Sequence, residues 1–182
     1  MAKELTLKRT FDAPRELVFK AWTDPKLVSQ WWGPSEFTTP ICEIDPRLGG
    51  KLYIVMHGPK GSEFDIDLPV WGVFQEFDPP RRLAFSNQAM PDEKGVKQLD
   101  TLCTVTFKET GDKTEMTLHI VLVTATPAAT AAWAGAEMGW NQSLDKLAST
   151  RDAEKGCTNM ENSGQQVLLQ IFGGNLPQAS CG

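Results

Sequence analysis

The strongest candidate for acid–base chemistry in this chain is Glu137. It falls between Trp133 and Trp140 at helical spacing, on what we expect to be the apolar face of a helix. A carboxylate on such a face is costly unless it is paired or hydrogen-bonded, and burial raises its pKa. Glu137 could therefore anchor a polar ligand group or act as a general acid or base, or equally reach the rim or pair with an arginine.

A nucleophile and a base could come from Cys103 and His119, which lie on adjacent predicted strands. We expect the hairpin between them to pair Lys108 with Lys113. This register places Cys103 opposite Leu118, so that His119 points to the other face. A shift of the register by two residues keeps this result. The sequence thus argues against a Cys–His dyad and favours a small buried thiol.

Metal chemistry has little support in the sequence. The two histidines, His57 and His119, have no second ligand at helical spacing, and strand alternation predicts that His57 faces solvent. Glu63, Asp65 and Asp67 are expected along one face of a strand. They could bind a hard cation or a basic partner, but the wet face of a half-buried strand is the simpler interpretation. We expect no metal ion and no cofactor, since phosphate-loop and dinucleotide motifs are also missing from the sequence.

The composition limits the class of protein. Of 182 residues, 41% are hydrophobic and 23% charged, with a formal net charge of −5, which is typical of one globular domain with a short extension. The sequence has no Lys/Arg cluster to neutralise phosphates, which disfavours nucleic-acid binding. The N-terminus lacks an apolar signal core and the four cysteines form no CxxC pair, so we expect a cytoplasmic setting. Six Trp against one Tyr suggest a lined pocket as well as a core.

The elements that must position these side chains follow from the hydrophobic period. Alternation predicts a first strand at 3–11, followed by two short helices that begin near Pro14 and Pro25. From about 40 to 123 the period is two and turn residues separate the runs, which is typical of an antiparallel meander. A long helix is then expected from 126 to 148, with its apolar face against the sheet.

The chain divides into a domain at 1–148 and a polar, glycine-rich tail at 149–182. Within the tail, the apolar run 167–172 belongs either to a disordered extension or to an added edge strand. The stretch 116–136 carries no charged residue and is long enough to raise the question of a membrane span. Its pattern changes halfway from alternation to helical spacing, so we interpret it as a buried strand followed by the start of a helix.

Several motifs, in a fixed order, carry a family resemblance. They are Phe11-Asp12-Ala13-Pro14, the run from Val18 to Pro25, Trp31-Trp32-Gly33-Pro34, Gly49-Gly50-Lys51, Met56-His57-Gly58-Pro59, the run from Glu76 to Leu83, and Gly139-Trp140 with Leu144 to Leu147. Together they resemble the SRPBCC (START-like) superfamily. More narrowly, they are similar to bacterial homologues of the C-terminal domain of the activator of the heat-shock-protein-90 ATPase. The resemblance covers residues 3 to about 148.

The resemblance implies an α+β helix-grip fold, in which a curved antiparallel sheet wraps a long C-terminal helix and two short helices follow the first strand. It also implies a cavity between sheet and helix, with its mouth near the short helices. The superfamily includes lipid carriers, aromatic polyketide cyclases, proteins that sequester reactive small molecules and partners of the 90-kDa chaperone. The fold alone therefore does not settle the function, and no shared catalytic motif is implied.

These observations favour the binding of a small hydrophobic or aromatic molecule, because the elements expected around the cavity are rich in tryptophan. Each candidate for the lining could equally be plain core. The candidates are Trp31, Trp32, Trp71, Phe85, Cys103, Thr104, Leu118, Glu137 and either Met138 or Trp140. Two alternatives stay open: a cyclase- or dehydratase-like enzyme that uses Glu137 in the same cavity, and a partner that stimulates the ATPase of the 90-kDa heat-shock chaperone.

Overall fold

The computed structural model describes residues 3–149. Its elements, in chain order, are β1 (Glu4–Phe11), α1 (Arg15–Thr23), α2 (Pro25–Trp31), β2 (Thr38–Ile44), β3 (Lys51–His57), β4 (Asp67–Asp78), β5 (Arg82–Pro91), β6 (Lys97–Thr110), β7 (Lys113–Ala125), a short 3₁₀ helix η1 (Pro127–Ala129), α3 (Thr130–Ala134) and α4 (Ala136–Ser149). Of the predicted tail, Ser149 alone is described, as the last residue of α4. The interpretations of the tail and of the run 167–172 otherwise lie outside the described residues.

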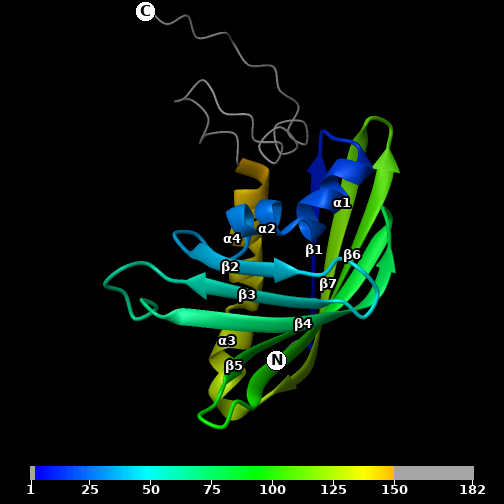
Figure 1. Cartoon of the computed structure of the whole chain (residues 1–182). Coiled ribbons are helices and arrows are strands. Elements are labelled where there is room, and N and C mark those ends of the chain that lie inside the picture. Colours follow the sequence, from blue (N-terminus) through cyan, green and yellow to red (C-terminus); the bar gives the residue numbers. More distant parts are fainter. Residues whose placement is uncertain (1–2, 150–182) are drawn as a thin grey trace, which may run out of the picture.

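The strands form one antiparallel sheet in the order β1-β7-β6-β5-β4-β3-β2, with β1 and β2 as its edges, so the sheet is not closed. The sheet curves around α4: β2, β3 and β4 run across the helix, whereas β6 and β7 run more nearly along it (Figure 1). This arrangement confirms the helix-grip fold. The first strand and the two short helices are confirmed as well.

Alternate residues of the central strands face the helices and form the core. On β6 and β7 these are Cys103, Val105, Phe107, Met116, Leu118 and Ile120. Cys103 pairs with Ile120 and Thr104 with His119, a register two residues from the predicted one. Because a shift of two preserves the face, Cys103 is fully buried whereas His119 points to the opposite, partly exposed face. The Cys–His dyad is excluded, as predicted.

Asp24 lies at the junction between the two short helices. Asp24 ends α1 and caps α2, because its carboxylate accepts a hydrogen bond from the backbone N–H of Lys26 at 3.0 Å. The two helices are then locked together by Trp31, whose indole N–H donates to the carbonyl of Ala21 at 3.0 Å. Both helices therefore pack as one unit over one end of the concave face of the sheet.

The prediction of one continuous helix from 126 to 148 is wrong, because the segment breaks at Gly135. The ψ angle of Gly135 is −5°, outside the α-helical range, and glycine is a poor helix former. Trp133 and Leu144 are buried, but Glu137 between them is exposed. The expectation that Glu137 lies on the buried face is therefore wrong.

The prediction of one strand through Glu63, Asp65 and Asp67 is wrong for Glu63 and Asp65. β4 begins only at Asp67, and residues 58–66 form a loop between β3 and β4. We call this segment the 58–66 loop. Phe64 and Ile66 alternate with polar residues, but they do so on a turn rather than on a strand.

Local hydrogen bonds explain why the 58–66 loop is not extended. The Ser62 hydroxyl donates to the carbonyl of Pro59 and accepts from the backbone N–H of Phe64, so the side chain takes the place of a strand partner. Gly58 permits the fold-back, since a Cβ there would lie 2.1 Å from the carbonyl oxygen of Phe64. Consequently Glu63 and Asp65 do not share a strand face with Asp67.

No helix within residues 3–149 is long and apolar enough to cross a bilayer. The uncharged stretch 116–136 divides between β7 and the helices that follow it, as expected.

Candidate functional site: an open apolar cavity

A cavity of about 870 Å³ lies between the helices and the concave face of the sheet. Its described lining comes mainly from four segments of the chain, within 32–37, 64–70, 87–91 and 132–143. These segments belong to the turn after α2, the 58–66 loop with the start of β4, the end of β5, and α3 with the first half of α4. This volume falls in the range of small-molecule sites.

Four of the described residues in the helical wall of the cavity have almost no side chain. Ala132, Gly135, Ala136 and Gly139 all line it. They recur at i, i+3, i+4 and i+7, which places them on one side of a helical segment. A Cβ at Gly139 would meet nothing closer than Pro34 at 3.6 Å. The space therefore exists because this side of the helix carries too little volume to fill it.

The rim of the cavity is apolar and exposed. Phe64 is 47% exposed, Ile66 53%, Met90 37% and Met138 65%, and all four line the cavity. A cluster of large exposed apolar side chains around a cavity is unusual on a protein surface unless something covers it. The rim combines the 58–66 loop, the end of β5 and the start of α4.

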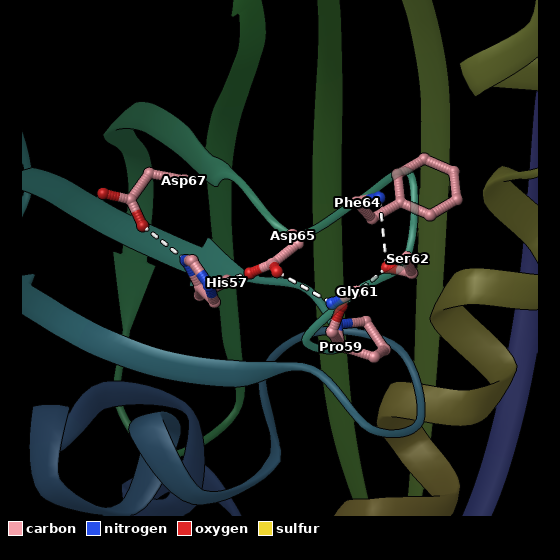
Figure 2. Close-up of polar contacts among 7 residues, drawn as sticks. All are labelled: His57, Pro59, Gly61, Ser62, Phe64, Asp65 and Asp67. Carbon is pink, nitrogen blue, oxygen red and sulfur yellow. Dashed lines mark hydrogen bonds and ion pairs between the residues drawn. The ribbon is translucent and has the colours of Figure 1, made fainter.

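The 58–66 loop is held over the cavity by a histidine between two carboxylates (Figure 2). His57 Nδ1 lies 2.8 Å from Asp67 Oδ1, and His57 Nε2 lies 3.1 Å from Asp65 Oδ1. Asp65 also accepts a hydrogen bond from the backbone N–H of Gly61 at 2.8 Å. The two carboxylates raise the pKa of His57, and the Gly61 and His57 contacts lower the pKa of Asp65.

This cluster is a clasp rather than a metal site. The two ring nitrogens of His57 point to different carboxylates, on opposite sides of the imidazole ring. Within residues 3–149 no group of three His, Cys, Asp or Glu side chains converges on a point that could hold a metal ion. The simpler interpretation of the acidic residues as a wet surface nevertheless missed their contacts with His57.

A lysine fixes the opposite side of the mouth. The ammonium group of Lys146 donates to the backbone carbonyls of Gly33 at 3.3 Å, Pro34 at 3.4 Å and Phe37 at 3.0 Å. Its half-buried position lowers its pKa. The turn after α2 is thereby attached to α4, so these two walls of the cavity keep a fixed separation.

One face of the cavity carries polar groups. Asn87 lines it from β5, and Thr101 on β6 donates a hydrogen bond to the Asn87 backbone carbonyl at 3.2 Å. Cys103 lies beyond them, and burial raises the pKa of its thiol to about 12, against the effect of hydrogen bonds from Thr101 and Asn87. A thiol with so high a pKa is not a nucleophile at neutral pH.

Three predicted ligand residues, Trp32, Met138 and Trp140, line the cavity. The ring centroids of Trp32 and Trp140 lie 5.2 Å apart in a T-shaped arrangement. Phe85 lies next to them, with its ring centroid 6.2 Å from that of Trp32. Trp31 is fully buried, and its ring packs 5.6 Å from that of Trp32. The structure thus brings these four aromatic residues together, although only two of them reach the cavity.

Trp71 and Thr104 lie on the opposite face of the sheet. Trp71 packs against Tyr53 there, at 5.7 Å between ring centroids, with the Lys97 ammonium 4.0 Å above its ring. Thr104 stands opposite His119 on the same outer face. Their neighbours along the strands occupy the inward positions, and successive residues alternate between faces. Their expected place on the cavity wall is therefore wrong.

The remaining predicted residues also lie outside the described lining. Cys103 and Leu118 are fully buried core residues further along the concave face. Glu137 is exposed on α4, between Ala136 and Met138, which do line the cavity. The prediction missed the small residues of the helical wall, whose spacing was visible in the sequence, and it missed Asn87, which had no such signal.

Comparison with known proteins agrees with this geometry. A family model described as "Activator of Hsp90 ATPase homolog 1-like protein" matches residues 12–152. A comparison with curated proteins found no significant match.

Solved structures with the same fold come from several bacteria. A protein from Arthrobacter aurescens has a TM-score of 0.68 at 24% identity, covering 87% of this chain and 94% of its own. One from Chromobacterium violaceum has a TM-score of 0.67 at 23% identity, covering 82% and 96%. The AHSA1 protein from Silicibacter pomeroyi has a TM-score of 0.66 at 24% identity, covering 83% and 99%. At these identities the likeness concerns the fold alone.

Proposed function

Because this chain belongs to the Activator of Hsp90 ATPase homolog 1-like family, within the SRPBCC superfamily whose fold is generally a ligand-binding one, we propose that it binds a small apolar or aromatic molecule in the cavity. The observation that carries the proposal is the exposed apolar rim of Phe64, Ile66, Met90 and Met138 around a cavity of about 870 Å³. A ligand that covered this rim would remove it from water.

The magnitude of apolar burial defines the size of the ligand. Burial of ~300 Å² gives roughly 7 kcal/mol before association costs of at least ~4 kcal/mol, which leaves only millimolar affinity. Each further ~100 Å² adds about 2.5 kcal/mol at the same rate. The cavity volume has room for such a larger molecule, so we expect useful affinity from bicyclic or larger ligands rather than from single rings.

The test is to fill the cavity from the helical wall. Ala136→Phe places a ring on the small-residue side, where Ala136 lines the cavity. We expect at least one member of a panel of neutral bicyclic aromatics and medium-chain alcohols to bind the wild type, as measured by calorimetry. We expect the variant to weaken that binding at least about tenfold, with an unfolding temperature close to that of the wild type. Ala134→Phe, at an exposed position outside the described lining, is the matched control.

The enzymatic alternative depended on Glu137 as the proton-transfer group. Glu137 is exposed and lies outside the described lining of the cavity, so its position does not support this role.

The chaperone alternative rests on the family description, and the same apolar rim would then be buried against a protein. An ATPase assay with the 90-kDa heat-shock chaperone separates the two functions. Stimulation that survives Ala136→Phe would favour the chaperone role, because this substitution fills the cavity without removing the rim.

A further inference from the structure

Asn87 is the one polar side chain among the described residues of β5 that line the cavity. It lies on β5 between Phe85 and Ala89, and the alternation of the strand turns these three side chains to the concave face. Ala89 and Asn87 both line the cavity, and Phe85 packs behind them against Trp32. An amide in such surroundings needs hydrogen-bond partners.

The partners of Asn87 account for only part of its amide. Its backbone carbonyl accepts a hydrogen bond from Thr101 Oγ1, and its side chain hydrogen-bonds to the thiol of Cys103. The side-chain oxygen, Oδ1, is buried and accepts no hydrogen bond from any described residue. Buried polar atoms without a partner are rare in native proteins, and each costs free energy.

The terminal torsion of asparagine is soft, so small rotations of the amide need little energy. A rotation about this torsion would bring Oδ1, which is buried in the structure, to the cavity that Asn87 lines. Oδ1 is an acceptor, so the group that satisfies it must donate a hydrogen bond.

Charge disfavours ionised groups inside the cavity. Among the described residues that line the cavity, Asp67 is the one with a formal charge, and its Oδ1 is 2.8 Å from His57 Nδ1. An anionic group buried in the cavity would therefore meet no cationic lining side chain, and a cationic group away from Asp67 would be buried without a counter-charge, which is unfavourable in both cases.

We propose that the cavity selects neutral, largely apolar molecules that carry one hydroxyl or N–H group, and that this group donates a hydrogen bond to Asn87 Oδ1. The proposal rests on the proposed function and narrows its ligand class. Asn87 is then the residue that sets specificity, whereas the surrounding aromatic and aliphatic side chains supply most of the affinity.

The test compares 1-naphthol with 1-methoxynaphthalene, which has a similar shape but no donor. Calorimetry gives the ratio of their dissociation constants for the wild type and for Asn87→Leu, a substitution of similar size without an acceptor. Because the effect of the extra methyl group cancels between the proteins, the change in the ratio isolates the hydrogen bond. We expect the wild type to prefer 1-naphthol about three to ten times more strongly than the variant does.

Met138→Ala is the control, because Met138 lines the same cavity from the exposed rim. It should weaken the binding of both probes and leave their ratio unchanged. A measurement on the wild type alone does not depend on the folding of a variant: the side-chain amide signals of Asn87 in NMR should shift with 1-naphthol and much less with 1-methoxynaphthalene.

The outcomes separate the two proposals. An equal ratio in wild type and Asn87→Leu, with equal NMR shifts for both probes, would overturn the role of Asn87 and leave ligand binding standing. No binding of either probe, or of any member of the wider panel, would contradict the proposed function and with it the narrower ligand class.

Discussion

The concave face of the sheet is covered in two different ways along its length. At one end, which we call the packed end, α1 and α2 fill the space with aromatic rings. The ring of Phe19 lies 5.5 Å from that of Phe77 and 5.4 Å from that of Phe107, both edge-on. The rings of Trp22 and Trp31 lie 4.7 Å apart. Such contacts add to the stabilisation that burial alone provides.

At the other end, which we call the open end, the same sheet faces α3 and the start of α4. Several helical side chains there are small, namely Ala132, Gly135, Ala136 and Gly139, whereas Trp140 and the residues of the rim are large. One sheet thus supports a close-packed core and a cavity, and the difference lies in the volume that the helices bring to it. The packed end should control stability and the open end should control binding.

The largest effect should come from Trp31→Ala at the packed end. Trp31 is fully buried and its indole N–H is hydrogen-bonded, so its loss should lower the free energy of unfolding by about 3–5 kcal/mol in urea titrations. Trp71→Ala is the comparison, since Trp71 is half-buried on the outer face of the sheet and should cost much less. Equal losses for the two variants would mean that the packed end does not control stability.

The next largest effect should come from Gly58→Ala, which acts on the open end through the backbone. The new Cβ would lie 2.1 Å from the carbonyl oxygen of Phe64, so the 58–66 loop must move. We expect a loss of about 1–3 kcal/mol in stability together with weaker ligand binding. Gly139→Ala is the control: its Cβ meets only Pro34 at 3.6 Å, and alanine should stabilise the helix slightly. If Gly58→Ala bound the ligand with unchanged affinity, the 58–66 loop would not contribute to ligand binding.

A smaller effect should appear as a pH dependence of the 58–66 loop. Asp67 and Asp65 raise the pKa of His57 in the folded protein. The contacts of His57 therefore stabilise the 58–66 loop fully at a pH below the pKa of histidine in the unfolded chain, about 6.5. This contribution is lost as the pH rises through the higher folded value. The pKa of Asp65 is lowered, so its contribution is lost only when the pH falls below about 3.8 and through the folded value. The loop should be held best between these limits.

NMR can follow this dependence through the amide signal of Gly61, whose N–H donates to Asp65. In the wild type this signal should shift as the pH rises above 6.5, and it should follow the titration of the His57 ring. His57→Gln should remove the shift. A variant that retained the full titration would show that His57 does not hold the loop.

The smallest effect on stability should come from Met138→Ala at the open end. Met138 is 65% exposed, so its truncation should change the free energy of unfolding by no more than about 0.5 kcal/mol. Any loss should appear instead in the affinity for ligands that reach the rim. A large loss of stability would mean that the rim is part of the core.

Much of the fold could be predicted because local signals and alternation agree with the tertiary structure. Asp24 followed by Pro25 predicted the start of α2. The period of two in β6 and β7 predicted that Cys103 and His119 lie on opposite faces of the sheet. The failures have local causes. Glu137 shares the helical spacing of Trp140 and Leu144, but it lies in the first turn of α4, where its neighbours line the open cavity, and it is exposed.

The cavity was harder to predict than the fold because it is defined by missing volume. Trp32 and Trp140 were found through their type, whereas Ala132 and Gly139 contribute by what they lack. The sequence did not indicate that Asn87 lines the cavity. A polar residue in an alternating strand is expected at the surface until the face on which it lies is known. Three-dimensional packing alone shows which small and polar residues meet.

The pairing of β1 with β7 has a consequence for the order of events on the ribosome. Leu5 pairs with Ile120, so the first strand waits for about a hundred further residues before its partner exists. At typical rates of translation this delay lasts roughly 5–20 s. The helical wall from Ala132 to Ser143 emerges later still. The complete cavity is therefore among the last features that a nascent chain acquires, and the proposed ligand meets only chains whose sheet has already been completed.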